Sequence, residues 1–555
     1  MKKIGRKKDW GLALTAAGLA ASVIATSGGC GGSPSTKDTK ISGNYNILFV
    51  LVDQEHFFKE YPIGTSFRAR QLLAEMGTTF EKHYACSNMS TSSRSTIFTG
   101  THIPETGMID NTDFPWQDAM DDALRTIGDR LREAGYYTAL KGKWHMADST
   151  IQGGGELDTL EGYGFADWGG TDYIGSLWQG HEKDPVVVSE AMEWLGGKGK
   201  KLNADGTPFF LAVTMINPHD IMDYNITDFQ SPTLHMGGKP DSPVYDTTYS
   251  EPVPSTWDFD LTAADVPQAV KMYYNNWGII AGNLTSRELW KDYQNYYFNC
   301  IQDSDDNMMK LLEYLDENGM MDNTIIVFTA DHGEMHGSHG LKGKGGFIYE
   351  NNIHIPLIIV HPDHKGGRTV SAVTSNVDLA ATFVDMTNLT GDKKIEISKG
   401  LRGYSLVPLM DKSKSSVRDG ALFCYEMLSM SAWLPQELTP QGGLDYQTAF
   451  KNGMGRGMAR GIITEDGYKL IRHFAPLGFN TPATLDALFA SNDVQVFDLK
   501  ADPDETNNLA SEANREANAA LISELNGRLN ALIEKEIGAD TGAEVVAELK
   551  KISGN

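Results

Sequence analysis

The chain has 555 residues, of which 41% are hydrophobic and 10% aromatic, and its formal net charge is -25 at pH 7. This length and composition predict a packed globular protein with one large domain and a smaller one. The acidic balance argues against nucleic acid as a partner, and any anionic substrate would need a locally basic pocket. Four cysteines do not make a disulfide framework, although one bridge among Cys86, Cys300 and Cys424 stays open.

Residues 1–29 are predicted to be a secretory signal peptide. Basic residues gather within the first eight positions, and the apolar stretch 11–25 that follows is too short to span a membrane. Cys30 follows small residues, as in bacterial lipoproteins, although Ser27 stands where Leu is usual. We therefore expect a flexible tether at 30–44 and a lipid on Cys30, which would place the protein in the bacterial cell envelope as a periplasmic or outer-membrane-attached lipoprotein. The alternative is simple secretion.

Five nearly continuous apolar segments predict strands, and such runs suit strands that are covered on both faces, as in parallel sheets. They occupy residues 46–52, 136–140, 209–213, 324–330 and 355–360. Segments with apolar residues at helical spacing alternate with them, which favours an α/β sandwich with a mostly parallel sheet. Residues 225–295 are rich in Pro, Gly and Asp and are predicted to form long loops.

Polar side chains follow four of these strands. They are Asp53 after the first, Lys143 and His145 after the second, His219 after the third, and Asp331 and His332 after the fourth. Ligands of such sheets bind beyond the carboxyl ends of the strands, so we expect these side chains to meet at one edge.

Ser90 and Arg94 form the most informative local pattern. The hydroxyl lies four residues before the arginine, where an apolar run can start a helix. Arginine offers a fork of donors to a sulfuryl or phosphoryl group, and a helix start offers free N–H groups and the positive end of a dipole. The spacing indicates attack on an oxyanion ester, whereas the alternative is that Ser90 only caps the helix.

The pattern of the chain changes near residue 456. The predicted elements there are a hairpin over 461–472 with its turn at 465–467, a short strand at 496–499, and a closing helix marked by Leu521, Leu525, Leu529 and Leu532. We therefore expect a catalytic domain at 45–455 and a smaller α+β domain at 456–555.

The order and spacing of the motifs resemble the formylglycine-dependent sulfatases of the alkaline-phosphatase-like superfamily, from about Asn46 to Leu509. The matching motifs are Ser90-Thr91-Ser92-Ser93-Arg94 with Thr99-Gly100, Gly142-Lys143-Trp144-His145, Asp331-His332-Gly333, His339-Gly340-Leu341, Lys344, Tyr349-Glu350 and Phe497-Asp498-Leu499. The resemblance implies an alkaline-phosphatase-like sandwich, a large mostly parallel sheet flanked by helices. Ser92 departs from the family, which usually has Pro or Ala at this position, and the maturation enzyme uses that position to recognise its target.

The resemblance implies one divalent cation, held by Asp53, Gln54, Asp331 and His332 with Ser90 beside it. Oxygen ligands favour Ca2+ or Mg2+ and the histidine nitrogen leans toward Mn2+; Ca2+ is expected first. The Asp-Gln and Asp-His pairs resemble choline sulfatases and phosphonate monoester hydrolases more than the animal arylsulfatases. The alternative is that these polar residues merely cap the strands.

The resemblance also implies how the ester is attacked. Ser90, oxidised to formylglycine by a maturation enzyme and then hydrated, would be the nucleophile, and Arg94 would lower the cost of its oxyanion. Lys143 and Lys344 would neutralise the sulfate oxygens as charge builds during transfer.

Two histidines complete the implied machinery. His145 would take a proton from the second hydroxyl of the hydrate, and His219 would protonate the leaving alcohol or orient the ester. Lys141 and Lys342 are interpreted as solvated surface residues. For His339, a contact near the substrate and a structural role are equally supported.

Three functions compete. The first is an exported sulfatase that hydrolyses sulfate monoesters, on a carbohydrate or another small organic sulfate. The second is a phosphonate monoester or phosphodiester hydrolase on the same scaffold, and the third is a silent binding protein in which Ser90 is never oxidised. Fold alone decides none of these. We expect specificity to come from 225–295 and from the region between Tyr425 and Tyr446, and membrane contact only through a lipid on Cys30.

Overall fold

The computed structural model describes residues 44–147, 159–435, 439 and 443–553. The predicted signal peptide, Cys30 and nearly all of the predicted tether lie outside the described residues. In the described part of the chain, no helix combines the length and the apolar character that crossing a membrane requires.

Seven strands form the central sheet, in the order β3-β4-β1-β5-β6-β2-β7. Their bounds are β1 Asn46–Asp53, β2 Thr78–Tyr84, β3 Tyr137–Gly142, β4 Phe209–Pro218, β5 Thr324–Ala330, β6 Leu357–Val360 and β7 Arg368–Ser375. Among these strands only β6 runs antiparallel to its neighbours. The predicted α/β class with a mostly parallel sheet is therefore confirmed, and the apolar run at 355–360 supplies its one antiparallel strand.

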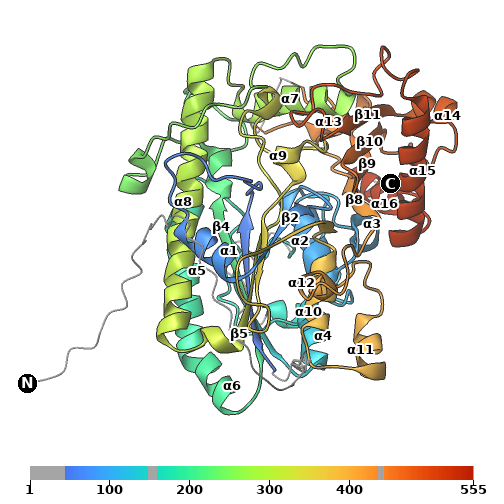
Figure 1. The fold of residues 1–555 in the computed structure, drawn as a ribbon. Helices are drawn as coiled ribbons and strands as arrows, with labels where there is room; N and C mark the ends of the chain where they lie inside the picture. Colours follow the sequence, from blue (N-terminus) through green and yellow to red (C-terminus); the bar gives the residue numbers. More distant parts are fainter. Residues whose placement is uncertain (1–43, 148–158, 436–438, 440–442, 554–555) are drawn as a thin grey trace, which may run out of the picture. The chain divides into compact units, whose positions relative to one another are not determined.

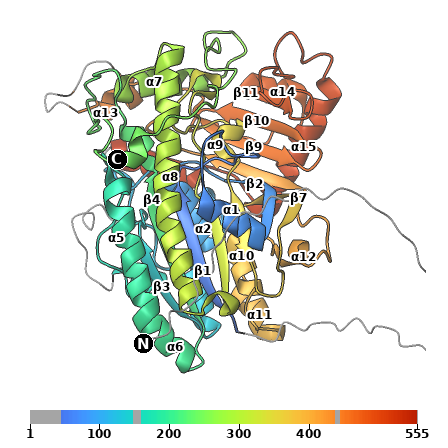
Figure 2. The same ribbon diagram turned by 60° about the vertical axis from the view of Figure 1, so that its left-hand side comes forward.

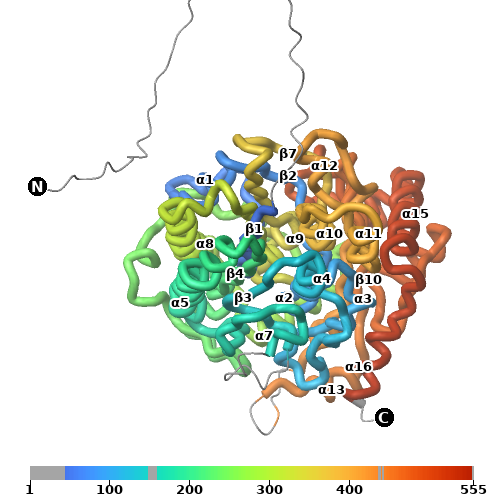
Figure 3. Tube along the Cα trace, turned by 90° about the horizontal axis from the view of Figure 1, so that it is seen from below, coloured from blue at the N-terminus to red at the C-terminus, as the bar shows by residue number. Residues whose placement is uncertain are grey.

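Helices cover both faces of this sheet, as Figures 1 and 2 show. One layer contains α2 Ser90–Thr99, α4 Ile127–Glu133 and α10 Asp378–Asp385; the other contains α1 Arg68–Met76, α5 Gln179–Trp194 and α8 Arg287–Glu317. Seen from below, β1, β4 and β3 lie between α8 and α5 on one side and α4 and α10 on the other (Figure 3). The sequence of β1 explains the two layers, because Phe49 packs into the first core and Val50 into the second.

A second, antiparallel sheet has the order β11-β10-β9-β8. Its strands are β8 Gly420–Tyr425, β9 Met458–Thr464, β10 Tyr468–Phe474 and β11 Asp493–Asp498, and α15 Ala519–Glu536 packs on it. The predicted hairpin, short strand and closing helix are all present. The sheet also takes in β8, which comes before residue 456 and pairs with β9 over its whole length.

The prediction of long loops throughout 225–295 is wrong in two parts, because α8 already begins at Arg287 and a further helix precedes it. Residues Gln268–Ala281 form α7, whose buried face includes Val270, Tyr273 and Trp277. Their helical spacing was obscured by the Pro- and Gly-rich composition of the flanking segments. The other α-helices are α3 Ile103–Thr106, α6 Lys200–Ala204, α9 Glu350–Ile353, α11 Gly391–Ser398, α12 Val407–Met410, α13 Tyr446–Lys451, α14 Leu485–Ser491 and α16 Ala543–Ser553.

Candidate active site

Four adjacent strands bring the predicted site residues to one edge of the central sheet. Val52 pairs with Ala330 between β1 and β5, so the next residues, Asp53 and Asp331, emerge side by side. Lys143 follows β3, and His219 begins a short turn directly after β4. Helix α2 starts beside them with Ser90. The expectation that these side chains meet is therefore fulfilled by the geometry.

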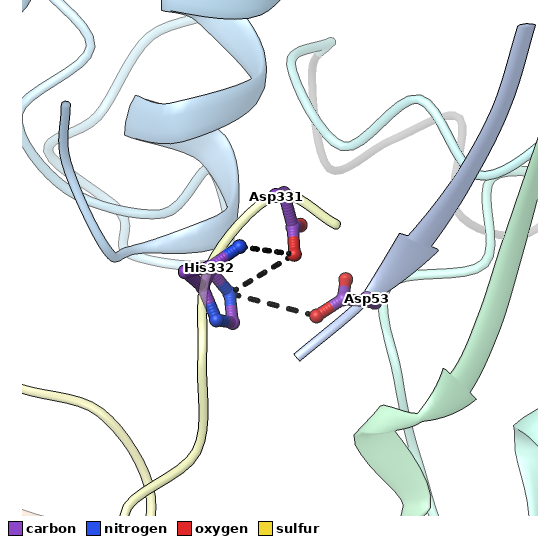
Figure 4. Close-up of side chains that lie close together, drawn as sticks. All are labelled: Asp53, Asp331 and His332. Carbon is purple, nitrogen blue, oxygen red and sulfur yellow. Dashed lines mark hydrogen bonds and ion pairs between the residues drawn. The ribbon is translucent and has the colours of Figure 1, made fainter. Parts of the chain in front are cut away.

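Asp53, Asp331 and His332 form a buried trio whose donor atoms all lie within 4.8 Å of one another (Figure 4). His332 Nε2 is 3.5 Å from a carboxylate oxygen of each aspartate. His332 Nδ1 lies 3.1 Å from the carbonyl oxygen of Gly333, which places its proton on Nδ1 and leaves the Nε2 lone pair free. Two carboxylates and one free imidazole nitrogen are a donor set that fits a divalent cation.

Gln54 adds an amide to this trio. Its backbone has a φ of 75°, a left-handed conformation that is uncommon for a residue with a side chain, and its N–H donates to Asp331 at 3.1 Å. The side-chain amide donates to Glu334 at 2.5 Å, and its oxygen accepts from Lys344 at 2.8 Å. The amide oxygen is thus directed toward the site rather than toward Glu334.

Ser90 lies at the centre of the cluster. It is the first residue of α2 and is completely buried. Its Oγ is 3.0 Å from His332 Nε2 and 3.4 Å from Asp53, and it accepts a hydrogen bond from Lys344 at 3.1 Å. The Ser90 hydroxyl, which the sequence predicts to attack the ester, therefore lies next to two of the residues that could bind a cation, Asp53 and His332. It also lies next to the ammonium group of Lys344.

Arg94 forms hydrogen bonds inside the site through all three nitrogens of its guanidinium group. Its Nε donates to Asp331 at 3.0 Å, and Nη2 donates to Asp53 at 3.2 Å. Nη1 donates to the carbonyl oxygen of Lys143 at 3.1 Å. Arg94 therefore braces both carboxylates and the segment after β3, a set of contacts that the Ser-to-Arg spacing alone did not indicate.

Three cationic side chains gather around two carboxylates. The Lys143 ammonium lies 2.7 Å from Asp53 and donates to the carbonyl of Ile174 at 2.8 Å. Burial lowers the pKa of Lys344 to about 8. Although burial alone would raise the pKa of Asp53, the charges around it, of which Lys143 is the nearest, hold it well below its usual range. The site thus gathers three basic side chains around two carboxylates in a protein that is acidic as a whole.

The segment that carries Lys344 rests on the second sheet. His473 of β10 donates through Nε2 to the carbonyl of Gly346 at 2.7 Å. Lys469, on the same strand, donates to the carbonyl of Ile348 at 2.6 Å and pairs with Glu505 at 2.8 Å. Both side chains are buried, so these bonds are shielded from water. The C-terminal sheet therefore supports part of the site directly.

His145 is held by two carboxylates that sequence reasoning missed. Its Nε2 lies 2.8 Å from Asp113, and its backbone N–H donates to Asp172 at 2.8 Å. Asp172 also accepts from the N–H of Trp144 at 2.8 Å, which stabilises the left-handed backbone of His145, φ 60°. Burial first, and then the charge of Lys143, lowers the pKa of His145.

His219 packs against a glycine. The Cβ of any other residue at Gly175, where φ is +104°, would lie 2.3 Å from the imidazole Cε1 of His219. Burial and the Lys143 charge hold the pKa of His219 well below its usual value, so the ring is a neutral hydrogen-bonding group. Its Nδ1 has no hydrogen-bond partner among the described residues.

One short segment, residues 172–175, therefore contacts three of the predicted catalytic residues. Asp172 holds the backbone of His145, the carbonyl of Ile174 holds Lys143, and Gly175 faces His219. The segment has no regular secondary structure and no periodic pattern, so the sequence carried no signal for it.

Gly175→Ala is expected to lower kcat/KM by on the order of tenfold to a hundredfold, because the added methyl group must displace the His219 ring. The check is steady-state hydrolysis together with thermal unfolding. Gly238→Ala is the matched control, since a Cβ at that loop glycine would meet nothing within 4 Å. Equal activity of the two variants would mean that the position of the His219 ring does not matter.

Three residues that the sequence marked as weaker candidates, Lys141, Lys342 and His339, bond to backbone carbonyls instead of to the site residues. Lys342 is buried and donates to the carbonyl of Ala281 at 2.8 Å, so its interpretation as a solvated residue is wrong. Lys141 is half-buried and donates to the carbonyl of Asp167. His339 is buried, donates toward the carbonyl of Glu505 at 3.1 Å and stacks on Tyr349, which is a structural setting. The cysteines Cys86, Cys300 and Cys424 are free.

Comparison with known proteins gives consistent matches. The model of the sulfatase family matches residues 45–389. The chain is 26% identical to the N-acetylglucosamine-6-O-sulfatase of Bacteroides thetaiotaomicron, over 87% of this chain and 85% of that protein. A structure solved in complex with its substrate, D-glucosamine-2-N,6-O-disulfate, has a TM-score of 0.58 at 22% identity and covers 90% of this chain and 99% of its own. The phosphonate monoester hydrolase of Agrobacterium radiobacter has a TM-score of 0.63 at 19% identity, with 89% and 96% covered.

Proposed function

Since this chain belongs to the sulfatase family and is a sulfuric ester hydrolase, we propose that it hydrolyses a sulfate monoester carried by a carbohydrate. The observation that carries this proposal is the buried cluster around Ser90, where Arg94, Lys143 and Lys344 lie beside two aspartates at the edge of the sheet. The relative of matching length acts, by its name, on a 6-O-sulfated amino sugar, which supports a sugar sulfate as the substrate class.

The residues of the chain can be given roles in this reaction. Asp53, Gln54, Asp331 and His332 would hold a divalent cation, Ca2+ first and Mn2+ or Mg2+ as alternatives, which would stabilise negative charge beside Ser90. Ser90 is proposed to be oxidised to formylglycine, whose hydrate supplies the nucleophilic hydroxyl.

The remaining side chains bind the ester and move protons. Lys143 and Lys344 would draw in the sulfate oxygens and neutralise the charge that grows on them. His219, a neutral imidazole, would donate a hydrogen bond to the oxygen that leaves with the sugar. His145 would take the proton of the second hydroxyl of the hydrate, so that sulfate is expelled. Arg94 keeps both carboxylates in place throughout.

Lys143→Ala is expected to lower kcat/KM by on the order of a hundredfold for sulfate and phosphate esters alike, because both transition states lose one neutralising cation. Lys141→Ala is the matched control: it lies two residues away and contacts a backbone carbonyl rather than the carboxylates of the site. The measurement is hydrolysis by purified enzyme that was expressed together with a maturation enzyme. Unequal losses for the two ester classes would mean that Lys143 contacts only one of them.

A phosphonate monoester or phosphodiester hydrolase is the second candidate. Gln54 and His332 favour it, since this ligand pair resembles that of the phosphonate hydrolases. The two functions separate on a panel of 6-O-sulfated glucosamine, choline sulfate, a phosphonate monoester and a phosphodiester. We expect the sugar sulfate to have the highest kcat/KM, with slower cleavage of the phosphorus esters. A phosphorus ester that exceeds every sulfate would reverse the assignment.

We further propose that the protein is exported and anchored by a lipid on Cys30. The basic start, the short apolar stretch and the small residues before Cys30 support this, and simple secretion remains the alternative. Intact-mass measurement of the mature protein from its host tests it. A chain that begins at Cys30 and carries added acyl mass is expected, and a chain that retains residues 1–29 would refute export.

A further inference from the structure

Asp113 is an exposed carboxylate at the site, whereas Asp53, Asp172 and Asp331 are buried. It lies in the irregular segment between α3 and α4, and its side chain is 46% exposed, whereas the side chain of its partner His145 is 2% exposed. Asp113 Oδ1 is 2.8 Å from His145 Nε2. A charged carboxylate can only accept a hydrogen bond, so the imidazole proton lies on Nε2 and the lone pair lies on Nδ1.

The backbone of His145 is fixed as firmly as its ring. Asp172 accepts the His145 N–H, and the hydroxyl of Thr91 donates to the His145 carbonyl at 2.7 Å. Thr91 is the residue after Ser90, so one hydrogen bond links the backbone of His145 to the start of α2. The ring therefore cannot shift easily relative to the attacking position.

His145 Nδ1 is left as a buried nitrogen with no hydrogen-bond partner among the described residues. Buried polar atoms without partners are uncommon, and functional sites are a recurrent place for them. The structure thus shows a ring with one nitrogen paired with a carboxylate and the other without a partner among the described residues.

We propose that Asp113 is the positioning residue of His145, which keeps the proton on Nε2 and so keeps Nδ1 as the proton-accepting nitrogen. This inference rests on the proposed sulfatase mechanism. In this step the O–H bond of the second hydroxyl of the hydrate breaks and its proton goes to Nδ1. The electron pair left on that oxygen forms the C=O bond of the aldehyde as the C–O bond to sulfate breaks, so sulfate leaves, and the imidazolium is paired with the Asp113 carboxylate. The carboxylate itself keeps its charge.

The charged groups around His145 determine the sign of the pH effect. Lys143 lowers its pKa, and Asp113 and Asp172 raise it. Removing the Asp113 charge should therefore lower the pKa of His145 further. A base with a lower pKa stays unprotonated at lower pH, so the acid limb of kcat/KM should move to lower pH.

The test is Asp113→Asn in the matured enzyme. Asparagine can present its amide N–H₂ to Nε2, which would move the imidazole proton to Nδ1. We expect kcat to fall by about 10- to 100-fold with KM changed by less than about threefold, and the acid limb to shift downward. Asp113→Glu should recover part of kcat. Asp118 is an exposed acid of the same segment that pairs with Lys551, so Asp118→Asn is the control. It should leave kcat, KM and the acid limb unchanged.

A second readout does not depend on sulfatase activity. In protein labelled with 15N-histidine, the His145 signals, assigned with the help of His145→Gln, should show a protonated Nε2 in the wild type and a changed tautomer in Asp113→Asn. A loss of kcat with an unmoved pH profile and an unchanged tautomer would overturn the proposal. A correct tautomer in a protein that hydrolyses no sulfate would instead overturn the proposed function.

Discussion

Ser90→Ala is expected to abolish sulfate ester hydrolysis, with a fall in kcat of at least ~10^4-fold. Alanine cannot be oxidised to formylglycine and offers no oxygen to attack the ester. The folded protein should tolerate the change, because Lys344 keeps its hydrogen bond to Gln54 when the Ser90 hydroxyl is lost. The measurement is hydrolysis of a sulfated sugar, with thermal unfolding to confirm that the variant folds.

Two further results sharpen this prediction. The tryptic peptide His83–Arg94 of active wild type should show the loss of two hydrogens, or the hydrate of the aldehyde. Ser90→Cys should regain activity when it is expressed with a maturation enzyme that oxidises cysteine, since the family signature accepts either residue. Active enzyme with only unmodified Ser90 would require direct attack by the serine alkoxide, and the formylglycine proposal would be wrong.

Asp331→Asn is expected to remove the bound cation and to lower kcat/KM by on the order of a thousandfold, because one of two carboxylate ligands loses its charge. The same substitution should not destabilise the metal-free folded protein, although it lowers activity. Burial and the Asp53 charge raise the pKa of Asp331 to about 6, so its negative charge is unfavourable in the folded protein without a cation. At neutral pH the metal-free variant should unfold at the same or a higher temperature than the metal-free wild type.

The experiment compares Tm with and without added Ca2+, together with elemental analysis. Binding to the folded state alone should raise the wild-type Tm as Ca2+ is added, and Asp331→Asn should not respond. Asp322→Asn, an exposed acid on the surface, is the control and should respond like wild type. Full activity after exhaustive chelation, with no metal detected, would falsify the metal requirement.

The fold could be predicted for those strands whose sequences are almost entirely apolar. The continuous apolar runs of β1 and β5 identified buried parallel strands, and the polar residues after them identified the binding edge. β2 and β7 gave no such signal, because charged or hydroxylated residues interrupt them: Glu81 and Lys82 in β2, and Arg368 in β7. Pairing with neighbouring strands, rather than composition, makes these segments extended: β2 lies between β6 and β7, and β7 pairs with β2 at the edge of the sheet.

The site could be predicted only as far as it lies next to strand ends. Asp113 and Asp172 act on His145 from segments without regular structure, and neither residue type nor spacing distinguishes them from other acidic residues in this chain. Lys342 was misread for a related reason. Its ammonium bonds to Ala281, the last residue of α7, where the unpaired carbonyls of a helix end attract a cation. A lysine becomes buried at a helix terminus only through tertiary packing, so the composition of the chain does not predict it.

The hydrogen bonds from β10 to the segment after Lys344 mean that catalysis and folding of the C-terminal sheet are coupled. His473 and Lys469 fix carbonyls within four residues of Lys344, and β8 would become an unpaired edge without β9. We therefore expect a chain shortened to residues 45–455 to be inactive. Partial opening of the second sheet should abolish catalytic activity before the central sheet unfolds. Enzyme activity should therefore be a sensitive probe of the earliest unfolding step.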